Sequence, residues 1–340
     1  MRPRLKDVAA LADVSTATVS RVVNDRPGVS DTVRDRVTDA LRQLRWEPSG
    51  IKGGRQARSV GLLFPELTNP IFPIFAQGIE WRLGLGGMIT VLCTSSPDGV
   101  NEQEHVDELL DMGIAALVFV AGSHADNSAD HGMYTSIVER GVPTIVVNGR
   151  ADGLEHVASV TCDDVESGRM ATEHLTRLGH RRVGLAAGRL DYVAGRNRRA
   201  GWERALEQAD VTVDGRTPVH EDSYTVDGGR RAGEALLDQG VTGVVCASDV
   251  IAIGVMEAAQ ARGLRIPEDI SVVGYDDSML MRYLNPPLTT VRQPIDAMCS
   301  AIARLCTDAT EGRDLATQEF AYLPELIARS STGPVQAVVS

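Results

Sequence analysis

The chain has 340 residues and a mass of 36.5 kDa, with 43% hydrophobic and 24% charged residues, so it can bury the cores of two or three ordinary domains and is neither disordered nor fibrous. The formal net charge of −12 argues against a protein that binds nucleic acid or anionic membrane over its whole surface. The charge is uneven, because residues 1–59 carry 12 Lys and Arg against 7 Asp and Glu, whereas residues 60–340 carry 22 against 39.

The N-terminal residues predict a protein without an export signal. Residues 1–7 lack the apolar segment of a signal peptide, and no apolar run of the chain approaches the ~20 residues of a membrane helix. The five cysteines lie far apart, with no C-x-x-C pair and no nearby set of histidine ligands, so neither a disulfide scaffold nor a zinc site is expected. We therefore expect a cytoplasmic protein with no membrane partner, no metal and no cofactor.

Residues 5–45 predict three short helices. Apolar residues have helical spacing from 5 to 12, and Ser15 is well placed to cap a second helix over 16–24. A Pro-Gly pair then breaks the chain, Ser30 can cap a third helix, and an apolar stripe follows as far as residue 44. This pattern predicts a three-helix bundle that contains a helix-turn-helix.

The second of these helices has the side chains of a DNA-reading helix, which would enter the major groove. Arg21 can donate two hydrogen bonds to guanine, while Thr16 and Ala17 are small enough to let the helix approach a base edge. These three are the predicted base-reading residues. A second set is predicted to position the DNA backbone, namely Leu5, Ser15, Thr18, Ser20, Asn24 and Ser30. A small helical bundle with a solvated basic face is the alternative.

Several motifs of this segment closely resemble the head of the LacI/GalR family of transcriptional regulators. They are Leu-Lys-Asp-Val-Ala at 5–9, Val-Ser at 14–15, Thr-Val-Ser-Arg-Val-Val-Asn at 18–24, Val-Ser at 29–30 and Trp-Glu-Pro at 46–48. The resemblance implies that Thr16, Ala17 and Arg21 occupy the base-reading positions of the family's recognition helix.

The linker at 48–59 departs from the family pattern. In the family, an alanine-rich hinge helix usually follows the proline and wedges a leucine into the minor groove, whereas here the linker is shorter, has three glycines and has no leucine. Glycine costs about 1 kcal/mol per helical position relative to alanine, so a stable hinge helix would need support from DNA. Lys52, Arg55 and Arg58 are candidates for DNA contacts, with Ile51 as the wedge. A flexible tether is the alternative.

From Val60 onward, strand and helix patterns alternate, which predicts an α/β fold with parallel sheets covered by helices. Apolar runs predict strands of a first sheet at 60–64, 88–93, 115–120 and 144–147, and strands of a second sheet at 182–187, 217–220, 243–247 and 270–274. Two open sheets of this kind create a cleft between their carboxyl ends, where a small ligand can bind.

The resemblance continues through this body, in the motifs at 67–72, 78–80, 178–182, 266–277 and 288–293. It implies a periplasmic-binding-protein-like core of two doubly wound lobes joined by three crossovers. The implied domains are a helix-turn-helix head at 1–47, a hinge at 48–59, an effector-binding and dimerisation core at 60–333 and a tail at 334–340. The first lobe is expected at 60–159 plus 292–320, and the second at 160–291 plus 321–333.

By the same resemblance, five residues are expected to contact an effector in the cleft. Arg198 matches the family arginine that clamps effector hydroxyls with its planar fork. Asp276 and Gln293 match contact positions that accept or donate hydrogen bonds. Phe72 and Tyr224 match wall positions, where an aromatic ring can pack on a pyranose, although either can equally belong to the core.

Three further candidates leave the effector's identity open. Asp249 is either a ligand contact or a helix N-cap. Ser248 stands where many sugar-responsive relatives have asparagine, and Gly149 replaces a common aspartate contact, which leaves Arg150 as the expected participant there.

The remaining polar residues and motifs predict no catalysis. Asp163 and Asp164 are expected to serve local capping, and His180 a structural turn. The chain has no P-loop, nucleophile elbow or zinc-deaminase pattern, and the Gly-Leu-Gly-Gly at 84–87 lacks the third glycine of a dinucleotide fingerprint. We therefore expect no enzyme.

Together, the residues and the resemblance predict a sequence-specific DNA-binding regulator, expected to act as a repressor. It would bind double-stranded, pseudo-palindromic operator DNA as a homodimer, under the control of a small-molecule effector, most simply a sugar or sugar derivative. A purine or a phosphorylated metabolite is an alternative effector, and a small-molecule sensor without operator binding is an alternative function. No heptad helix follows residue 332, which favours a dimer over a tetramer.

Overall fold

The computed structural model describes residues 5–23, 29–43, 59–95, 101–211, 217–313, 315 and 318–335. The four predicted hinge residues, Ile51, Lys52, Arg55 and Arg58, and the predicted phosphate contact Asn24 lie outside these ranges. The side chain of Leu5 is also outside the described part of the structure. In the part of the chain that is described, no helix is long and apolar enough to cross a lipid bilayer.

The N-terminal residues form three helices, as predicted: α1 (Leu5–Leu11), α2 (Thr16–Val23) and α3 (Asp31–Gln43). Their small core consists of alanine and valine side chains, among which Val8, Val19 and Val37 are fully buried. Asp13, in the turn between α1 and α2, has a φ of 53°, a left-handed conformation that aspartate tolerates better than most residues. The turn between α1 and α2 therefore needs only the four residues 12–15.

The first lobe is built on a six-stranded sheet in which every strand pair is parallel. Its strands are β1 (Ser59–Phe64), β2 (Ile89–Thr94), β3 (Ala116–Val120), β4 (Thr144–Val147), β5 (Ala158–Cys162) and β11 (Glu319–Tyr322), and their spatial order is β11-β5-β4-β3-β1-β2. One face packs against α4 (Ile71–Leu85) and α11 (Ile295–Thr310), and the other against α5 (Glu102–Asp111) and α6 (Gly132–Glu139).

The second lobe repeats this plan with one antiparallel strand. Its strands are β6 (Val183–Ala187), β7 (Val219–Glu221), β8 (Gly243–Cys246), β9 (Ser271–Asp276), β10 (Thr289–Arg292) and β12 (Glu325–Ile327), in the order β12-β10-β9-β8-β6-β7, with β12 antiparallel to β10. Helices α7 (Asp164–Arg177) and α8 (Val193–Gln208) cover one face, and α9 (Val226–Asp238) and α10 (Asp249–Ala261) cover the other. Short 3-10 helices, η1 (Ser123–Ala125) and η2 (Met279–Tyr283), lie in loops of the first and second lobe respectively.

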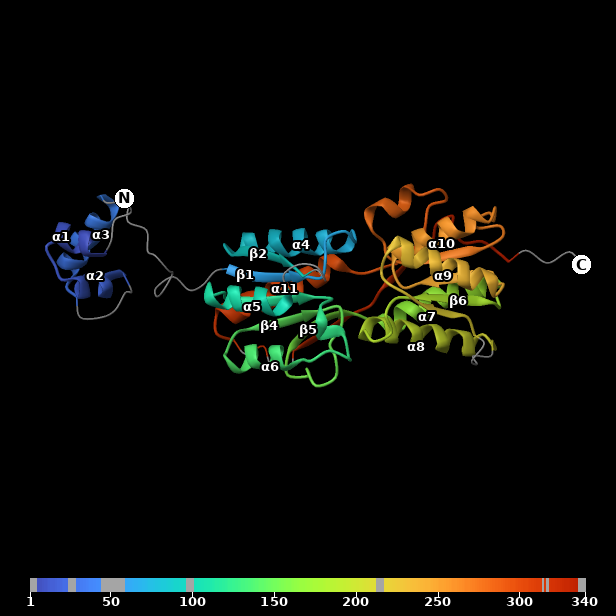
Figure 1. Ribbon diagram of the computed structural model, residues 1–340, viewed down its shortest axis with the longest axis horizontal. Helices are drawn as coiled ribbons and strands as arrows, with labels where there is room; N and C mark the ends of the chain where they lie inside the picture. Colours follow the sequence, from blue (N-terminus) through green and yellow to red (C-terminus); the bar gives the residue numbers. More distant parts are fainter. Residues whose placement is uncertain are drawn as a thin grey trace, which may run out of the picture.

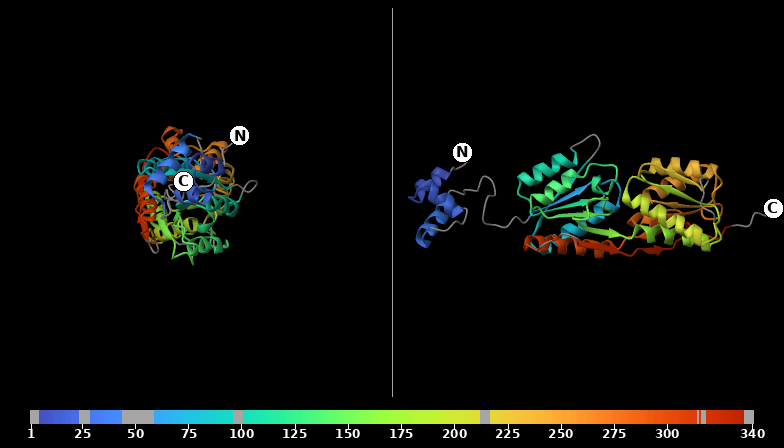
Figure 2. Two further views of the ribbon diagram at one scale, coloured as in Figure 1. Left: turned by 90° about the vertical axis from the view of Figure 1, so that its left-hand side faces the viewer. Right: turned by 90° about the horizontal axis from the view of Figure 1, so that it is seen from below.

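The two lobes lie end to end with helices on both faces of each sheet (Figures 1 and 2). The chain crosses between them three times, after β5, after β10 and after β11. All three crossovers involve the strands at one edge of each sheet, because β11 and β5 are neighbours in the first sheet and β12 and β10 are neighbours in the second. The two-lobed α/β architecture predicted from the sequence is thus confirmed, and the strand bounds place the crossovers a few residues beyond the predicted lobe limits.

Candidate functional site

The exposed face of α2 carries the three predicted base-reading side chains. Ser15 caps this helix as predicted, since the Thr18 amide donates to its Oγ at 3.1 Å. Val19 and Val22 of the same helix are buried against α1 and α3. The helical period then turns the intervening positions outward. Thr16, Ala17 and Arg21 are all exposed, Ser30 is exposed at the start of α3, and Thr18 and Ser20 are half-buried.

A cavity of about 200 Å³ lies at the carboxyl ends of strands from both lobes. Parallel strands present their following loops at one edge of a sheet, so side chains from several strands converge there. Six of the eight residues predicted to contact an effector line it, namely Phe72, Arg198, Tyr224, Ser248, Asp276 and Gln293.

Arg198 on α8 is a buried charged group of this cavity, with 9% of its surface exposed. Its Nη1 lies 3.1 Å from Oδ1 of Asp164, and its guanidinium stacks over the ring of Tyr275 at 4.2 Å from the centroid. Its Nη2 donates to the Tyr224 hydroxyl at 3.4 Å. The Nε atom is buried and has no partner among the described residues, so a directed donor is left for a ligand.

The ion pair between Arg198 and Asp164 persists although both groups are buried. Burial acts against the charged form of Arg198, but the carboxylate of Asp164 and the neighbouring polar groups outweigh it and raise the pKa of the guanidinium. Burial also raises the pKa of Asp164, and Arg198 acts against that rise. Asp164 additionally accepts from the Tyr275 hydroxyl at 3.2 Å. The pair therefore holds the guanidinium plane in one orientation.

Two glycines allow this pair to form, because they let α7 and α8 touch backbone to backbone. A Cβ at Gly168 would lie 2.0 Å from the carbonyl oxygen of Arg198, and one at Gly201 would lie 1.9 Å from that of Val165. Any side chain at these positions would push the helices apart. The first turn of α7, which carries Asp164, consequently meets the middle of α8.

Asp276 and Gln293 form the second polar group of the cavity. The Gln293 Nε2 donates to Oδ1 of Asp276 at 2.8 Å, whereas the buried Gln293 Oε1 has no partner among the described residues. Burial and the nearby Asp249 raise the pKa of Asp276, and Arg198 opposes the rise. The cavity thus presents buried acceptors on this side and an arginine donor on the other, the pattern required to bind vicinal hydroxyls.

Aromatic and apolar side chains form the walls between these polar groups. Phe72 packs edge-on against Phe64 with centroids 6.0 Å apart, and it is 9% exposed. Tyr224 is half-buried beside the core under α9 and α10, and Tyr192 lines the cavity from the start of α8. Phe72 and Tyr224 therefore belong both to a core and to the cavity wall, which combines the two alternatives that the sequence left open.

Arg150 does not line the cavity. Its Nη1 donates to the Val157 carbonyl at 3.1 Å, and its Nη2 donates to Glu319 at 2.8 Å, so the side chain ties β5 and β11 together. Asn148, two residues earlier, lines the cavity instead, with a φ of 61° that turns it at the end of β4.

Asp249 is neither a cavity residue nor the N-cap of α10. Ser248 is the cap, since its Oγ accepts from the Ile251 amide at 3.2 Å. The fully buried Asp249 instead accepts from the Ser278 amide at 2.8 Å, the Ser278 hydroxyl at 3.0 Å and the Thr290 hydroxyl at 2.6 Å. It thus fastens α10 beneath the ends of β9 and β10, and burial raises its pKa to about 7.

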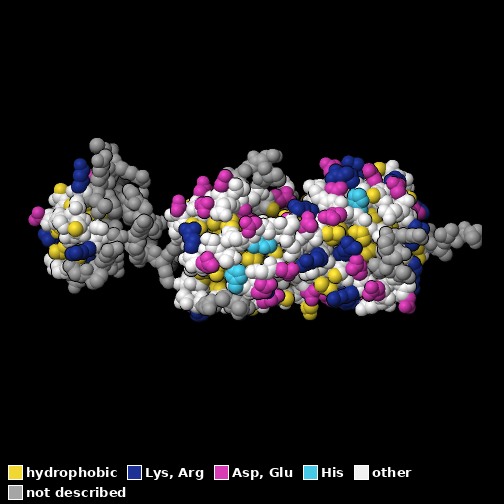
Figure 3. Space-filling model, turned by 60° about the horizontal axis from the view of Figure 1, so that its bottom comes forward, with side chains coloured by type: hydrophobic (Ala, Val, Ile, Leu, Met, Phe, Trp, Pro, Cys, Tyr) yellow, Lys and Arg dark blue, Asp and Glu magenta, His cyan; other side chains and the backbone are white. Residues whose placement is uncertain are grey.

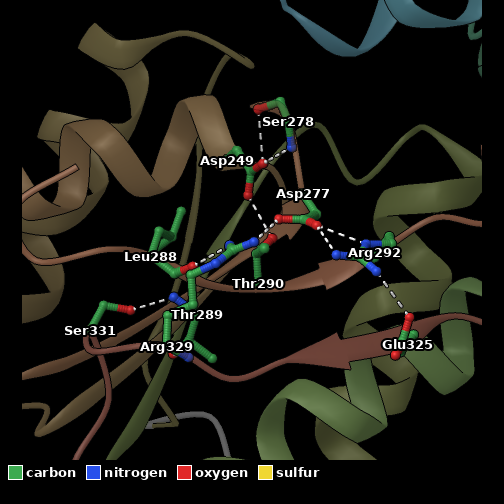
Figure 4. A network of polar contacts seen from close by, with 10 residues as sticks. All are labelled: Asp249, Asp277, Ser278, Leu288, Thr289, Thr290, Arg292, Glu325, Arg329 and Ser331. Carbon is green, nitrogen blue, oxygen red and sulfur yellow. Dashed lines mark hydrogen bonds and ion pairs between the residues drawn. The ribbon is translucent and has the colours of Figure 1, made fainter. Parts of the chain in front are cut away.

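A neighbouring set of contacts reaches the crossovers through Asp277, whose side chain is almost fully buried (Figure 4). Arg292, the last residue of β10, donates its Nε to Asp277 at 2.7 Å and its Nη1 to Glu325 of β12 at 3.2 Å. Arg329 forms a second ion pair with Asp277. One carboxylate therefore joins both crossover strands of the second lobe, directly beside the cavity residues Asp276 and Gln293.

Local roles predicted for three residues can be compared with their contacts. Asp163 caps α7 as predicted, accepting from the Glu166 amide at 2.9 Å. The prediction is wrong for Asp164, which pairs with Arg198 in the cavity. His180 is 2% exposed, and its ring nitrogens lie 3.0 Å from the Thr242 hydroxyl and 3.1 Å from the Gly333 carbonyl. It holds the segment that ends the described chain.

Sequence reasoning missed seven polar or aromatic lining residues, Glu66, Asn69, Asn148, Asp164, Arg189, Tyr192 and Tyr275. Most of them follow the carboxyl end of a strand within a few residues, a position that could have marked them. Within the described residues, no group of three or more His, Cys, Asp or Glu side chains is arranged to hold a metal ion. The geometry suits reversible binding of a neutral, hydroxyl-rich ligand.

Comparisons with known proteins match the two parts of the chain separately and together. Residues 4–49 match the family described as bacterial regulatory proteins, lacI family, and residues 172–332 match a periplasmic binding protein-like domain. Over 332 residues the chain is 44% identical to an HTH-type transcriptional regulator in the aml 5′ region of Streptomyces limosus, covering 97% of this chain and 94% of that protein. It is 41% identical over 336 residues to the HTH-type transcriptional regulator MalR of Streptomyces coelicolor, covering 98% and 97%.

Two solved structures of transcriptional regulators also align with nearly the whole chain. A complex of the transcriptional regulator CelR with cellobiose aligns with a TM-score of 0.74 and 33% identity, covering 97% of this chain and all of that one. The lac repressor dimer bound to operator and the anti-inducer ONPF aligns with a TM-score of 0.74 and 26% identity, covering 98% of this chain and all of that one.

Proposed function

Because the chain belongs to the LacI family of bacterial regulatory proteins, we propose that it is a transcriptional repressor that binds a pseudo-palindromic operator as a homodimer, and that a sugar in the interlobe cavity controls this binding. The observation that carries the proposal is the position of Arg21, exposed beside Thr16 and Ala17 on a capped helix whose opposite face is buried. Such a helix can enter the major groove without rearranging its own bundle.

The side chains of the head fall into two sets, one suited to base edges and one suited to phosphates. Arg21 would donate two hydrogen bonds to guanine, and Thr16 and Ala17 would contact neighbouring base edges. Ser15, Ser20 and Ser30, together with Thr18, would position the helix on phosphates. The excess of basic residues in the first 59 positions supplies the salt-dependent attraction to the DNA backbone.

The cavity supports a neutral sugar rather than a phosphorylated metabolite. The guanidinium of Arg198 is already paired with Asp164, and Asp276 and Glu66 add further carboxyl groups to the lining. Phosphate recognition favours cationic donors that are not already paired, and Arg189, the other arginine of the lining, is also paired, with Asp126. Arg198 Nε and Gln293 Oε1, which have no partner among the described residues, suit hydroxyl groups. Phe72 and Tyr224 offer surfaces on which a sugar ring can pack. The similarity to a regulator solved with cellobiose points the same way.

Exposed apolar side chains support the homodimer. Trp81 and Leu85 of α4 and Ile89 of β2 are exposed in the first lobe, with Leu85 at 72%, and Met279 and Tyr283 are exposed on η2 of the second. Helix α4 and the segment that contains η2 both lie on the upper side of the molecule in Figure 1. Acidic and basic side chains are interspersed over much of the face seen in Figure 3. Two copies of the chain would bury these groups against each other around a two-fold axis.

We propose that the effector acts by changing the relative populations of two arrangements of the lobes. The cavity takes side chains from both lobes, so a ligand that fits only one arrangement favours it by the difference in affinity. In a dimer, such a movement would change the spacing of the two heads and thereby their fit to the two half-sites.

The DNA-binding proposal is tested by incubating the purified protein with fragmented DNA from its own genome at moderate salt and sequencing the fragments that it retains. An enriched palindrome that a chain lacking residues 1–59 does not retain would support the repressor. Retention without any shared sequence, or no retention at several salt concentrations, would contradict sequence-specific binding and favour a sensor that acts without operator DNA.

The effector proposal is tested by measuring the melting temperature with glucose, ribose, maltose, cellobiose, glucose 6-phosphate and hypoxanthine. Stabilisation that saturates with one of the neutral sugars and is lost in Arg198→Met would support the proposal. Stabilisation only by the phosphate ester or the purine would contradict it.

A further inference from the structure

The two lobes touch away from the crossovers, through a pair of loops that belong to different sheets. The first loop follows η1 in the first lobe and contains Asp126 and Asn127; the second joins β6 to α8 in the second lobe and contains Arg189, Asp191 and Tyr192. Asp126 and Tyr192 form an isolated antiparallel β-bridge. The two lobes therefore pair main chain to main chain at this point.

Hydrogen bonds reinforce this bridge. The Asn127 amide donates to the Asp191 carbonyl at 3.0 Å, and the Asn127 Nδ2 donates to the same oxygen at 3.1 Å. Arg189 Nη2 donates to Oδ2 of Asp126 at 3.3 Å. Main-chain and side-chain contacts thus combine across the cleft.

Asp126 is prepared for this contact by its own loop. Its Oδ1 accepts from the Ser128 amide at 2.9 Å and the Ser128 hydroxyl at 2.6 Å, which leaves Oδ2 for Arg189. Burial acts to raise the pKa of Asp126, but the Ser128 hydrogen bonds and Arg189 outweigh it and lower the pKa below the ordinary value. The carboxylate is therefore oriented and charged where Arg189 meets it.

Arg189 is in turn part of the cavity. Its guanidinium lies over the ring of Tyr192, 5.0 Å from the centroid, and both side chains belong to the cavity lining. Asp126 does not line the cavity. It can therefore act on a ligand only through the position that it gives to Arg189.

The strand order places this contact on the side of the cavity away from the crossovers, so it can close the cavity and does not act as a second hinge. The crossovers involve β11, β5, β12 and β10, at one edge of each sheet. The two loops instead follow β3 and β6, which lie three and four strands away from that edge. The cavity thus lies between a covalent hinge on one side and the loop contact on the other.

We propose that Asp126 and Asn127 form an interlobe latch with Arg189 and Asp191, and that Asp126 is a positioning residue that holds Arg189 at the mouth of the cavity. The latch sets the balance between the closed and open arrangements before any effector binds, and its opening accompanies effector release. This last consequence rests on the proposed function, whereas the latch itself does not.

The test is hydrogen–deuterium exchange of the ligand-free full chain, with the Asn127 amide resolved by fragmentation in the mass spectrometer. Arg189→Gln is the main variant, because it leaves the Asn127 loop unaltered. Asp126→Asn keeps an acceptor for Ser128 and is analysed after correction for its altered intrinsic exchange rate. Asp130→Asn is the matched control, since Asp130 lies in the same loop and accepts from the Gly132 amide, within its own lobe.

An ion pair with one half-exposed partner contributes up to ~1 kcal/mol, so each latch variant is expected to speed exchange at Asn127 about two- to fivefold. The double variant Asp126→Asn/Arg189→Gln should exchange no faster than the faster single variant, because both remove the same interaction. Exchange at the wild-type rate in Arg189→Gln, or effects that multiply in the double variant, would overturn the latch. Because no ligand or DNA is present, that failure would leave the proposed repressor function untouched.

Discussion

Gly188 lies directly beneath the ring of Tyr224 in the cavity wall. A Cβ placed at Gly188 would stand 1.9 Å from Cζ of that ring and 2.4 Å from its hydroxyl oxygen. Only glycine therefore allows Tyr224 to lie flat against the loop that follows β6, within reach of Arg198.

Gly188→Ala is consequently expected to displace the Tyr224 ring and to weaken effector binding about tenfold or more, because a ring surface and the Arg198 contact are lost together. Titration calorimetry with the sugar that stabilises the protein most measures this. Tyr224→Phe is the matched control, since it keeps the ring and removes only the hydroxyl. An equal loss in both variants would show that the hydroxyl, and not the position of the ring, matters.

Arg21→Ala is expected to remove operator selectivity while leaving effector binding unchanged, because Arg21 lies on the exposed face of α2, far in sequence from the cavity residues. The loss of one bidentate guanine contact amounts to about 1–3 kcal/mol of discrimination. Fluorescence anisotropy with the selected operator and a scrambled duplex measures it. Arg36→Ala, an exposed arginine of α3, should preserve the ratio of the two affinities, and undiminished selectivity in Arg21→Ala would remove Arg21 from base reading.

Arg198→Ala is expected to abolish effector binding and to lower the free energy of unfolding by about 3–5 kcal/mol, because it leaves the Asp164 carboxylate buried without its partner. Arg198→Met/Asp164→Asn removes both charges and should recover most of the stability but none of the binding. Urea denaturation and calorimetry on both variants separate the two effects. Normal effector release from DNA in the double variant would refute the assignment of Arg198 to the cavity.

Asp249 predicts a pH dependence of stability. Its pKa is raised by burial from 3.8 to about 7 in the folded protein, so the folded state binds the proton more tightly than the unfolded state. Protonated Asp249 therefore contributes its full stabilisation to the free energy of unfolding below pH 3.8, and this contribution is lost as the pH rises towards 7. Because an amide does not titrate, the stability of Asp249→Asn relative to wild type should increase as the pH rises from 5 to 8, as measured by urea midpoints. A difference between the two proteins that does not vary with pH would show that Asp249 titrates normally.

Leu85→Glu is expected to convert the dimer to a monomer at micromolar concentration, because Leu85 is 72% exposed in one chain and a two-fold interface would bury two copies of the new charge. Sedimentation velocity measures the change. Met112→Glu, at the end of α5 and 56% exposed, serves as the control outside the proposed interface. An unchanged dimer in Leu85→Glu would place the interface elsewhere.

Much of the architecture could be predicted from local sequence. The helical spacing and the Ser15 cap predicted the head, and continuous apolar runs predicted β1 to β4 and β6 to β9, which extend to the edge of each sheet opposite the crossovers. The pattern did not indicate β5, β10, β11 and β12, which are short, mix polar with apolar residues and lie at the crossover edge. Their positions depend on pairing with neighbours that are distant in the chain, which local periodicity does not record.

The residues of the cavity were likewise only partly predictable from the sequence. The sequence by itself determined that polar side chains would follow strands whose carboxyl ends converge, and the motifs at 198, 276 and 293 marked three of them. Only the tertiary structure decided which way the neighbouring side chains turn: Asp164 towards Arg198, Asp249 beneath β10, and Arg150 towards β11. The physical reason is that a charged side chain takes the partner that compensates its desolvation, and that partner is supplied by elements more than thirty residues away.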